Sequence, residues 1–371
     1  MLAVSIHEHS GLGNQIWRAV CCRVFADRLG YDYAISHPGW RGPFLDFDFG
    51  EEIDLNVENK SDFYSCKKLP KGIDSYYEEK SIPFPEVMGE IGNADEAFFN
   101  IKDNTYIKGN FQRMSYIEDY RDEIRDWLTY DDKYKVTDFS SENICVIQLR
   151  GGDYTTGHSM LPPEYYHNAM KHMRDNNPNI EFVIVTDDPV TANRMIPGVP
   201  IVGSAVSGEK IYTKNIGWYT YPGGPVNLDY SILNTAKYAI ISASTFAFWP
   251  IWTNKNLLNV IVPKYWFDWS RSDGWWRPKD GIVNDDRWLW LDCDGNLMIG
   301  SDCKDEYQEY KNIETAKECL SSVYQIKYKE APEFHKIVQA KDFWIDTTKL
   351  NQLGLTQTIS IKKIINELCT N

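Results

Sequence analysis

Apolar and polar positions along the first forty residues alternate in a way that predicts a strand, a helix and a second strand. Residues 3–6 form a short apolar run typical of a buried strand. Residues 16–29 place most of their apolar side chains on one helical face, and Gly30 is a helix-stop signal. Residues 31–35 then predict another strand. The chain therefore begins with a βαβ-like unit.

The same alternation returns in the second half of the chain. We expect strands at 144–149, 181–186, 200–202, 238–242 and 259–262, and helices at 163–176, 229–237 and 244–254. Strands that alternate with helices predict a largely parallel sheet with helices on its faces. The fold class predicted for the whole chain is therefore α/β.

The segments between and after these two regions divide the chain. Residues 38–104 are irregular, 105–109 predict a strand and turn, 116–128 a charged helix, and 130–142 a polar link. From residue 265 the chain becomes dense in Trp, Asp and Lys, with helices expected at 315–324 and 359–368. We predict three parts: an N-terminal unit at 1–140, a second α/β unit at 141–264 and an appended region at 265–371.

Composition narrows the class of protein. A chain of 371 residues fits two domains, and its net charge of -14 argues against a broad nucleic-acid-binding surface. The start of the chain lacks a basic region and a long apolar core, and no apolar run is long enough to span a membrane. The eight cysteines show no CxxC spacing, which supports neither a zinc site nor a disulfide framework. We therefore expect a cytoplasmic protein; the sequence gives no oligomeric state.

Arg150 is the leading candidate for an anion-binding residue. It follows the apolar run 144–147 and precedes Gly151 and Gly152, where backbone can approach a ligand closely. Ligands of open α/β sheets bind at such strand ends, and a guanidinium suits a phosphate group. The alternative is an ordinary strand exit with a surface arginine.

Two further segments could bind phosphate at the start of a helix. Gly11 and Gly13 lie between the first strand and helix, although Ile16 occupies the third glycine position of a dinucleotide-binding motif. Ser244 and Thr245 precede a predicted helix and could cap it or bind an anion. A generic turn and a simple helix cap remain the alternatives, and Phe246 could belong to the core.

Several acidic residues have competing interpretations. Asp188 precedes a proline and favours helix capping, which leaves Asp187 free to accept hydrogen bonds from a base or a sugar. Asp292 and Asp294 could hold a divalent metal, but Asp294 with Gly295 between apolar runs favours a hairpin turn.

The segment before the first glycine loop carries candidates for proton transfer. His7 and His9 flank Glu8, with no third or fourth metal ligand evident, and an alternating strand edge is the competing interpretation.

Taken together, six ordered segments carry a resemblance. They are GLGNQ at 11–15, KGNFQ at 108–112, QLRGGDY at 148–154, EYY at 164–166, TDD at 186–188 and STFAFW at 244–249. This set resembles the α-1,2-fucosyltransferase family over roughly residues 1–262. In the family's motif His-x-Arg-Arg-Gly-Asp-Tyr, Arg150 matches the first arginine, which binds phosphate in the family. Gln148 stands at the histidine and Gly151 at the second arginine.

The resemblance implies a GT-B-like pair of Rossmann-type domains that face a central cleft. It also implies a GDP-fucose donor, a glycan acceptor, inversion at the anomeric carbon, and no metal or other cofactor. Within that scheme Arg150 stabilises the leaving diphosphate and Asn14 lies near the reacting centre. The donor-binding residues would be Gly11, Gly13, Gln15, Asp153, Asp187, Asp229, Ser244, Thr245 and Phe246.

Three assignments complete these expectations. Asp187 or Asp229 would recognise guanine, Asp153 would orient Arg150 or its loop, and the candidates for the base are Glu8 and His9, with His7 beside them. Acceptor specificity is expected in 38–104 and 266–276. The rival hypotheses are a metal-dependent glycosyltransferase that uses Asp292 and Asp294 and a non-catalytic carbohydrate-binding protein.

Overall fold

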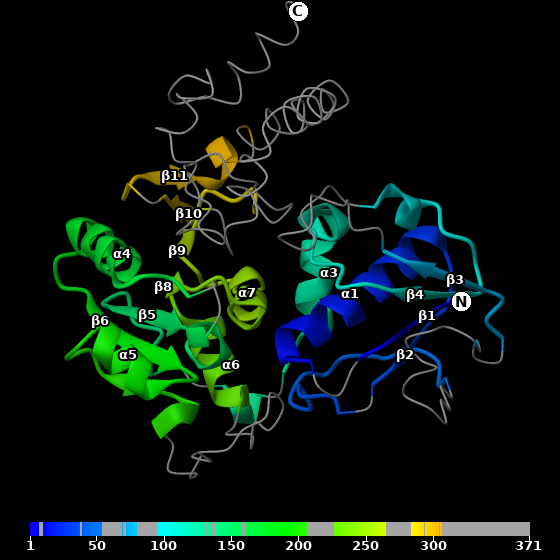
Figure 1. Ribbon diagram of the computed structural model, residues 1–371, viewed down its shortest axis with the longest axis horizontal. Coiled ribbons are helices and arrows are strands. Elements are labelled where there is room, and N and C mark those ends of the chain that lie inside the picture. The colour runs from blue at the N-terminus through cyan, green and yellow to red at the C-terminus, as the bar shows by residue number, and fades with distance from the viewer. Residues whose placement is uncertain are drawn as a thin grey trace, which may run out of the picture.

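Two α/β units lie side by side in the computed structural model of this protein (Figure 1). The structure describes residues 1–6, 10–37, 39–53, 69, 72–79, 95–130, 132–135, 138–156, 160–206, 226–264, 283–292, 294–303 and 305. Each unit is built on its own sheet, and the two sheets are drawn from separate halves of the chain. This arrangement confirms the expected α/β architecture of two Rossmann-type units.

The first unit has a four-stranded parallel sheet in the order β2-β1-β4-β3. Its strands are β1 (Leu2–Ser5), β2 (Tyr33–Ser36), β3 (Ser75–Glu78) and β4 (Thr105–Lys108). The long helix α1 (Leu12–Leu29) crosses over between β1 and β2 and ends at Gly30, whose backbone is left-handed. The start of the chain is therefore the βαβ-like unit that the alternation predicts.

The second unit has a seven-stranded sheet in the order β11-β10-β9-β8-β5-β6-β7, which is parallel apart from the β10–β11 pair. Its strands are β5 (Ile144–Leu149), β6 (Glu181–Thr186), β7 (Ile201–Val202), β8 (Tyr238–Ile241), β9 (Asn259–Pro263), β10 (Trp288–Leu291) and β11 (Leu297–Ile299). β5 lies inside this sheet, between β8 and β6, so its carboxyl end is flanked by a strand on each side.

Helices cover both faces of the second sheet. One face carries α4 (Pro163–Asn176) and α5 (Pro189–Met195), and the other carries α6 (Val226–Thr235) and α7 (Thr245–Trp252). The side chains of α6 and α7 join the apolar core that also contains α1. The face of the second sheet that α6 and α7 cover is therefore turned toward the first unit.

A packed aromatic contact joins the two units. Trp17 of α1 stacks on Phe248 of α7, with ring centroids 5.0 Å apart, and lies 4.7 Å from the Trp249 ring. Figure 1 shows α1 and α7 next to each other between the two sheets. The α1–α7 contact is therefore part of a continuous apolar core and fixes how the carboxyl ends of the two sheets face each other.

The structure departs from the expected elements in three places. The helix expected at 116–128 is reduced to α3 (Arg121–Trp127), which follows two 3-10 turns at Met114–Tyr116 and Glu118–Tyr120. The irregular region 38–104 contains β3. Residues 288–299, which we assigned to an appended region, form two strands of the second sheet, because β10 pairs with β9 and β11 pairs with β10.

Two expected helices, at 315–324 and 359–368, lie outside the described residues. Among the helices that the structure does describe, none combines the length and apolar character needed to cross a bilayer.

Candidate functional site

Arg150 leaves the carboxyl end of β5 with its guanidinium held by two carboxylates. One terminal nitrogen pairs with Asp187 and the other with Asp153, the latter at 2.5 Å. The guanidinium also lies over the Tyr154 ring, 5.2 Å from its centroid. The Arg150 side chain is only 21% exposed, so it is fixed in the structure and does not extend into bulk water.

Asp187 follows β6, the neighbour of β5, and its carboxylate spans the gap between the two strand ends. It accepts a 2.8 Å hydrogen bond from the Gly151 amide and pairs with Arg150. Burial raises the pKa of Asp187, while the nearby Arg150 charge acts to lower it. We predicted that Asp187 could recognise guanine; in the structure its carboxylate orients Arg150 and the Gly151 turn.

Ser242, which sequence patterns did not single out, connects Arg150 to the segment before α7. Its hydroxyl accepts a 2.8 Å hydrogen bond from the Arg150 amide and donates to the Gln148 carbonyl at 2.9 Å. The Tyr166 hydroxyl lies 2.8 Å from the Ser242 hydroxyl oxygen. The Tyr154 hydroxyl donates to the Ala243 carbonyl at 3.1 Å. Arg150 is therefore attached to the loop that leads into Ser244 and Thr245, as a shared site requires.

The two departures from the family motif have structural consequences. The Gln148 side chain is buried, and its Oε1 has no hydrogen-bond partner among the described residues. A Cβ at Gly151 would lie 2.5 Å from Cβ of Asp188. A second arginine at that position is therefore excluded by the way the Asp188 turn packs, which leaves Arg150 as the arginine of this motif.

Asn14 brings the first unit to the same place. Its Oδ1 accepts hydrogen bonds from the Thr245 hydroxyl at 2.7 Å and from the Gln112 amide at 3.1 Å. Asn14 lies in the first turn of α1 and Thr245 in the first turn of α7. The amino ends of these two helices therefore meet at the Asn14–Thr245 contact, and the partial positive charge of both helix ends favours an anion there.

Gly13 allows two helices to pack closely and does not belong to a flexible ligand-binding loop. The helix α1 begins at Leu12 with Gly11 as its N-cap, so 11–15 is mostly helical. A Cβ at Gly13 would lie 2.3 Å from the Thr245 carbonyl carbon. The glycine was expected to bring backbone close to a ligand, but what approaches here is the backbone of α7.

Gln15 also differs from its expected role. Its side-chain nitrogen donates to the Gly39 carbonyl at 3.1 Å, and its oxygen accepts from the Arg41 amide at 2.9 Å. The side chain is fully buried. Gln15 therefore stabilises the loop after β2, because both ends of its amide are used by that loop.

Ser244 and Phe246 occupy the start of α7. Ser244 is the N-cap residue and is buried, but its side chain makes no capping hydrogen bond. The Phe246 ring is half-buried and meets the Tyr230 ring edge-on at 6.4 Å. Of the hydroxyls expected at this helix start, Thr245 is the one that the structure connects to the first unit.

Asp229 lies at the start of α6 and is turned toward the end of β7. It accepts a 2.7 Å hydrogen bond from the Ser204 amide and a second bond from the Ser204 hydroxyl. Burial raises the pKa of Asp229 to about 6, although the bonds from Ser204 oppose that shift. A Cβ at Gly203 would lie 2.2 Å from the Asp229 carboxylate. The carboxylate thus holds the loop after β7, and its contact with guanine stays a prediction.

Two acidic segments have the structural roles that the turn and cap interpretations favoured. Asp188 caps α5 by accepting a 3.0 Å bond from the Thr191 amide. Asp292 closes the β10–β11 hairpin by accepting bonds from the amides of Asp294 and Asn296, at 2.9 and 2.8 Å. Asp292 is engaged in this turn, so the interpretation of a metal-binding pair is not supported. Within the described ranges no cluster of His, Cys, Asp and Glu has the arrangement of a metal site.

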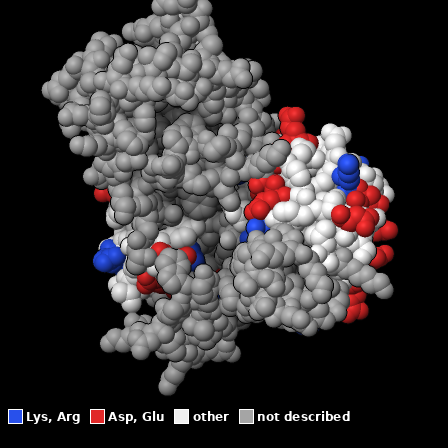
Figure 2. Space-filling model, turned by 45° about the vertical axis from the view of Figure 1, so that its right-hand side comes forward, with Lys and Arg blue, Asp and Glu red and all other residues white. Residues whose placement is uncertain are grey.

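The candidate bases His7, Glu8 and His9 lie outside the described residues, as does 266–276. The surface charge can be followed over the described part in Figure 2, where acidic side chains predominate over basic ones. No broad basic surface is visible on the described residues of that face, which agrees with the net charge of -14.

No protein-family model matches this chain. The chain is 21% identical over 285 residues to an α-1,2-colitosyltransferase of Escherichia coli. The match covers 70% of this chain and 90% of that protein. It is 25% identical over 141 residues to the O-antigen biosynthesis glycosyltransferase WbnK of Escherichia coli, over 36% of this chain and 42% of that protein. These similarities confirm the resemblance to fucosyltransferase-like glycosyltransferases that the ordered motifs predict.

Two solved structures overlap with the chain more loosely. A crystal structure of POFUT1 in complex with GDP covers 70% of this chain and 97% of its own, at 10% identity and a TM-score of 0.38. The fucosyltransferase NodZ from Bradyrhizobium covers 80% of this chain and 97% of its own, at 14% identity and a TM-score of 0.34.

Proposed function

We propose that this protein, a glycosyltransferase by its similarity to the two Escherichia coli enzymes, transfers a fucose-type sugar from a GDP-sugar donor to a hydroxyl of a glycan acceptor. The donor sugar is fucose, as the motif set implies, or its close analogue colitose. Transfer proceeds with inversion at the anomeric carbon and without a metal. The observation that carries the proposal is the fixed guanidinium of Arg150 at the carboxyl end of β5.

Arg150 is suited to stabilise the leaving group. As the sugar bond breaks, negative charge builds on the β-phosphate, and preorganised donors that meet this charge lower the barrier. Asp187 and Asp153 hold the guanidinium in advance. Asp153 is 46% exposed and Asp187 15%, so Asp153 is the carboxylate that a diphosphate would displace. Asp187 would remain as the fixed orienting partner.

The amino ends of α1 and α7 supply a second group of donors. Thr245 and Asn14 meet there, and Asn14 thereby connects the diphosphate region to the first unit. In this scheme the acceptor lies on the side of the first unit, the donor on the side of the second, and the reacting carbon near Asn14. A loose transition state needs little help from a base, and Glu8 and His9 remain the candidates for that role.

The proposal is tested by GDP binding and sugar transfer in Arg150→Ala and Arg150→Lys. Loss of one such donor typically costs about 3 kcal/mol, or on the order of a hundredfold in rate. We expect that loss in Arg150→Ala and a partial loss in Arg150→Lys, since lysine keeps the charge but not the planar fork. Arg194→Ala is the matched control, because Arg194 is an exposed arginine on α5 in the same unit.

The remaining parts of the proposal need separate measurements. A thermal-shift panel of nucleotides should raise the melting temperature most with GDP and GDP-sugars. Full activity in excess EDTA would support a metal-free reaction, and NMR of the product would give the anomeric configuration. Calorimetry that detects no GDP binding by the folded wild-type protein would contradict the proposed function and favour a non-catalytic carbohydrate-binding protein.

A further inference from the structure

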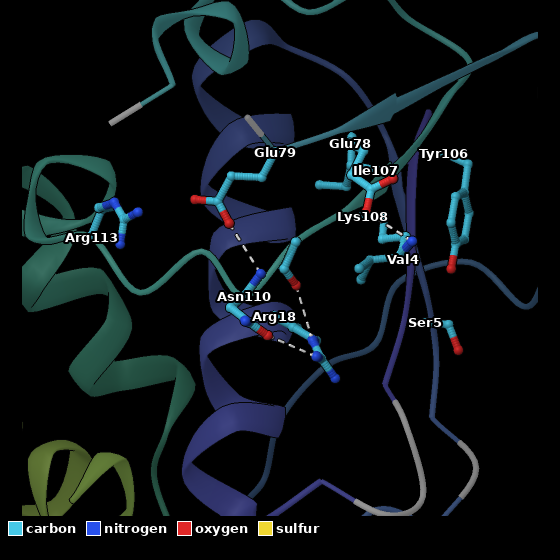
Figure 3. Close-up of a pocket in the computed structure, with 11 residues that line it drawn as sticks. Val4, Ser5, Arg18, Glu78, Glu79, Tyr106, Ile107, Lys108, Asn110 and Arg113 are labelled. Atoms are coloured by element: carbon cyan, nitrogen blue, oxygen red, sulfur yellow. Dashed lines mark hydrogen bonds and ion pairs between the residues drawn. The ribbon is translucent and has the colours of Figure 1, made fainter. Parts of the chain in front are cut away.

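A pocket of about 180 Å³ opens at the carboxyl edge of the first sheet, apart from Arg150. It is lined by the ends of β1, β3 and β4, by Arg18 of α1 and by the segment that follows β4. Figure 3 shows charged side chains from several elements around this space, with Glu78 and Lys108 near β1 and Arg113 on the opposite side, beyond Glu79. The pocket therefore combines basic, acidic and aromatic groups in a small volume.

Arg113 is the unusual member of this set. The residue is only 4% exposed. Among the described residues, the one hydrogen bond of its guanidinium is a long contact of 3.4 Å from a terminal nitrogen to the Gln112 carbonyl. Its Nε is buried and has no partner, and no carboxylate of the described residues forms an ion pair with it. A buried charge without a counter-charge costs several kcal/mol. Such a residue suggests a ligand that supplies the missing negative charge.

The other charged groups in the pocket already have partners. Lys108 pairs with Glu78 at 2.8 Å. Glu79 accepts from the amides of Asn110 and Phe111 at 3.0 and 2.9 Å and from the Tyr116 hydroxyl at 3.2 Å. Among the described residues, neither of these carboxylates forms an ion pair with Arg113. A carboxylate oxygen can accept from more than one donor, so sugar hydroxyls can share these groups with their present partners.

Arg18 completes the pocket's hydrogen-bonding surface. It donates to the Gly109 carbonyl at 3.0 Å, to the Ser10 hydroxyl at 2.9 Å and to the Asn110 side chain at 2.9 Å. All three acceptors are neutral. The segment at the pocket wall is thereby tied to α1, which makes the pocket a preformed one.

We propose that this pocket binds a sugar unit that carries a carboxylate, with the carboxylate on the Arg113 guanidinium and the sugar hydroxyls on Glu78 and Glu79. The planar fork of arginine matches a carboxylate with two parallel bonds. This inference rests on the proposed function, because it makes the acidic unit part of the glycan acceptor. It narrows the acceptor to an anionic glycan with a uronic acid or similar residue.

Position separates this site from the donor diphosphate. The residues that line the pocket all belong to the first unit, whereas Arg150 and Asp187 belong to the second. Gln112, the neighbour of Arg113, donates to Asn14, which in turn accepts from Thr245. A sugar held in the pocket would therefore lie on the acceptor side of the proposed reacting centre.

The test measures binding of matched methyl glycosides to the full-length protein saturated with GDP, at constant ionic strength. Calorimetry would compare methyl glucuronide with methyl glucoside, and methyl galacturonide with methyl galactoside. We expect one of the acids to bind about 10- to 150-fold more tightly than its neutral partner, which corresponds to a hydrogen bond to a charged group. Arg113→Gln should abolish this preference, and Arg125→Gln, on α3 of the same unit, should keep it.

Stability distinguishes a ligand-binding arginine from a structural one. Without a ligand, Arg113→Met should leave the melting temperature unchanged or raise it, because it removes an unpaired buried charge. Equal binding of acids and neutral sugars by the wild type would overturn the inference while leaving GDP binding and transfer intact. A loss of GDP affinity in Arg113→Gln would also overturn it, since Arg113 would then serve the donor phosphate.

Discussion

The indole Nε1–H of Trp249 donates a 3.0 Å hydrogen bond to the carbonyl oxygen of Gly13. Trp249 belongs to α7 of the second unit and Gly13 to the first turn of α1. The bond is possible because Gly13 has no side chain between the two helices. The relative position of Arg150 and Asn14 therefore depends on one glycine that sequence motifs associate with ligand binding.

Gly13→Ala should destabilise the protein and disrupt the site. The added methyl would lie 2.3 Å from the Thr245 carbonyl carbon, and backbone cannot yield as a flexible side chain can. Overpacking of this kind typically costs about 1–3 kcal/mol, and more where rigid backbone is in the way. Gly11→Ala is the control, since nothing lies within 4 Å of its Cβ position, and it should cost about 1 kcal/mol or less. Urea denaturation of both variants checks this, and equal midpoints would contradict the packing role of Gly13.

Asp187→Asn should lower transfer more than GDP binding. Asparagine can still accept from the Gly151 amide, but it no longer holds the Arg150 guanidinium by charge. A misplaced catalytic group costs up to about a hundredfold in rate. We expect kcat to fall 10- to 100-fold by that reasoning, with a smaller change in GDP affinity.

Two control variants for Asp187→Asn change carboxylates that are more exposed than that of Asp187. Asp153→Asn should have a smaller effect on kcat because that carboxylate is more exposed. Asp175→Asn, which removes an exposed partner of Lys171, should have none. An unchanged kcat in Asp187→Asn would show that Arg150 needs no orienting carboxylate.

Asp229 should make stability depend on pH in a defined window. Burial raises its pKa from the usual value of about 4 to about 6 in the folded protein. Between these values the folded state binds more protons than the unfolded state, so this contribution is present below about pH 4 and is lost as the pH rises through 6. The loss amounts to about 3 kcal/mol.

Asp229→Asn removes the titrating group and should remove that decline. As the pH rises from 4 to 7, the free energy of unfolding of the variant should therefore increase relative to that of the wild type. Denaturant unfolding at a series of pH values measures it. Parallel pH curves for the two proteins would contradict the assigned shift of Asp229.

Arg121→Gln should weaken the attachment between α3 and the second unit. Arg121 donates to the Trp252 carbonyl at 3.0 and 3.2 Å and pairs with Asp285 at 2.7 Å. Burial opposes ionisation of Asp285, but bonds from Arg287 and Arg121 hold its pKa well below the usual value. Loss of this partly buried network should cost about 2 kcal/mol.

Arg125 provides the matched control for Arg121. It lies one turn further along α3, its own side chain is 13% exposed, and it pairs with Asp122 of the same helix, which is 88% exposed. Because this pair lies within α3 and does not reach the second unit, Arg125→Gln should destabilise the protein less than Arg121→Gln, by about 1 kcal/mol or less. If the two variants have the same melting temperature, the Arg121 network does not stabilise the arrangement of the two units.

Hydrophobic patterning located most elements of both sheets, because an element that buries one face has apolar residues at regular spacing in the sequence. The strand at 144–149 and the helix at 163–176 have the bounds that the pattern predicts. Patterning did not predict the short strands that form because a neighbouring strand pairs with them. β3 and the β10–β11 hairpin are short, and their membership of a sheet depends on β4 and β9.

The candidate site divides in the same way. Arg150 could be found from its place after a buried strand, and Asp188 from the proline that follows it, because both signals are local. Ser242 and Arg113 could not be found, since nothing nearby in sequence reveals that Ser242 connects two strand ends or that Arg113 is buried without an ion pair to any described residue.

The sequence by itself determined the alternation of strands and helices, the arginine at the end of β5 and the ordered motifs, because each depends on residues close together in the chain. Only the tertiary structure decided that Gly13 meets Thr245, that Asp187 holds Arg150 and that Gln15 serves a loop. These relationships join residues from 24 positions apart, for Gln15 and Gly39, to 232 positions apart, for Gly13 and Thr245. Their geometry follows from how the two sheets pack, which no local pattern records.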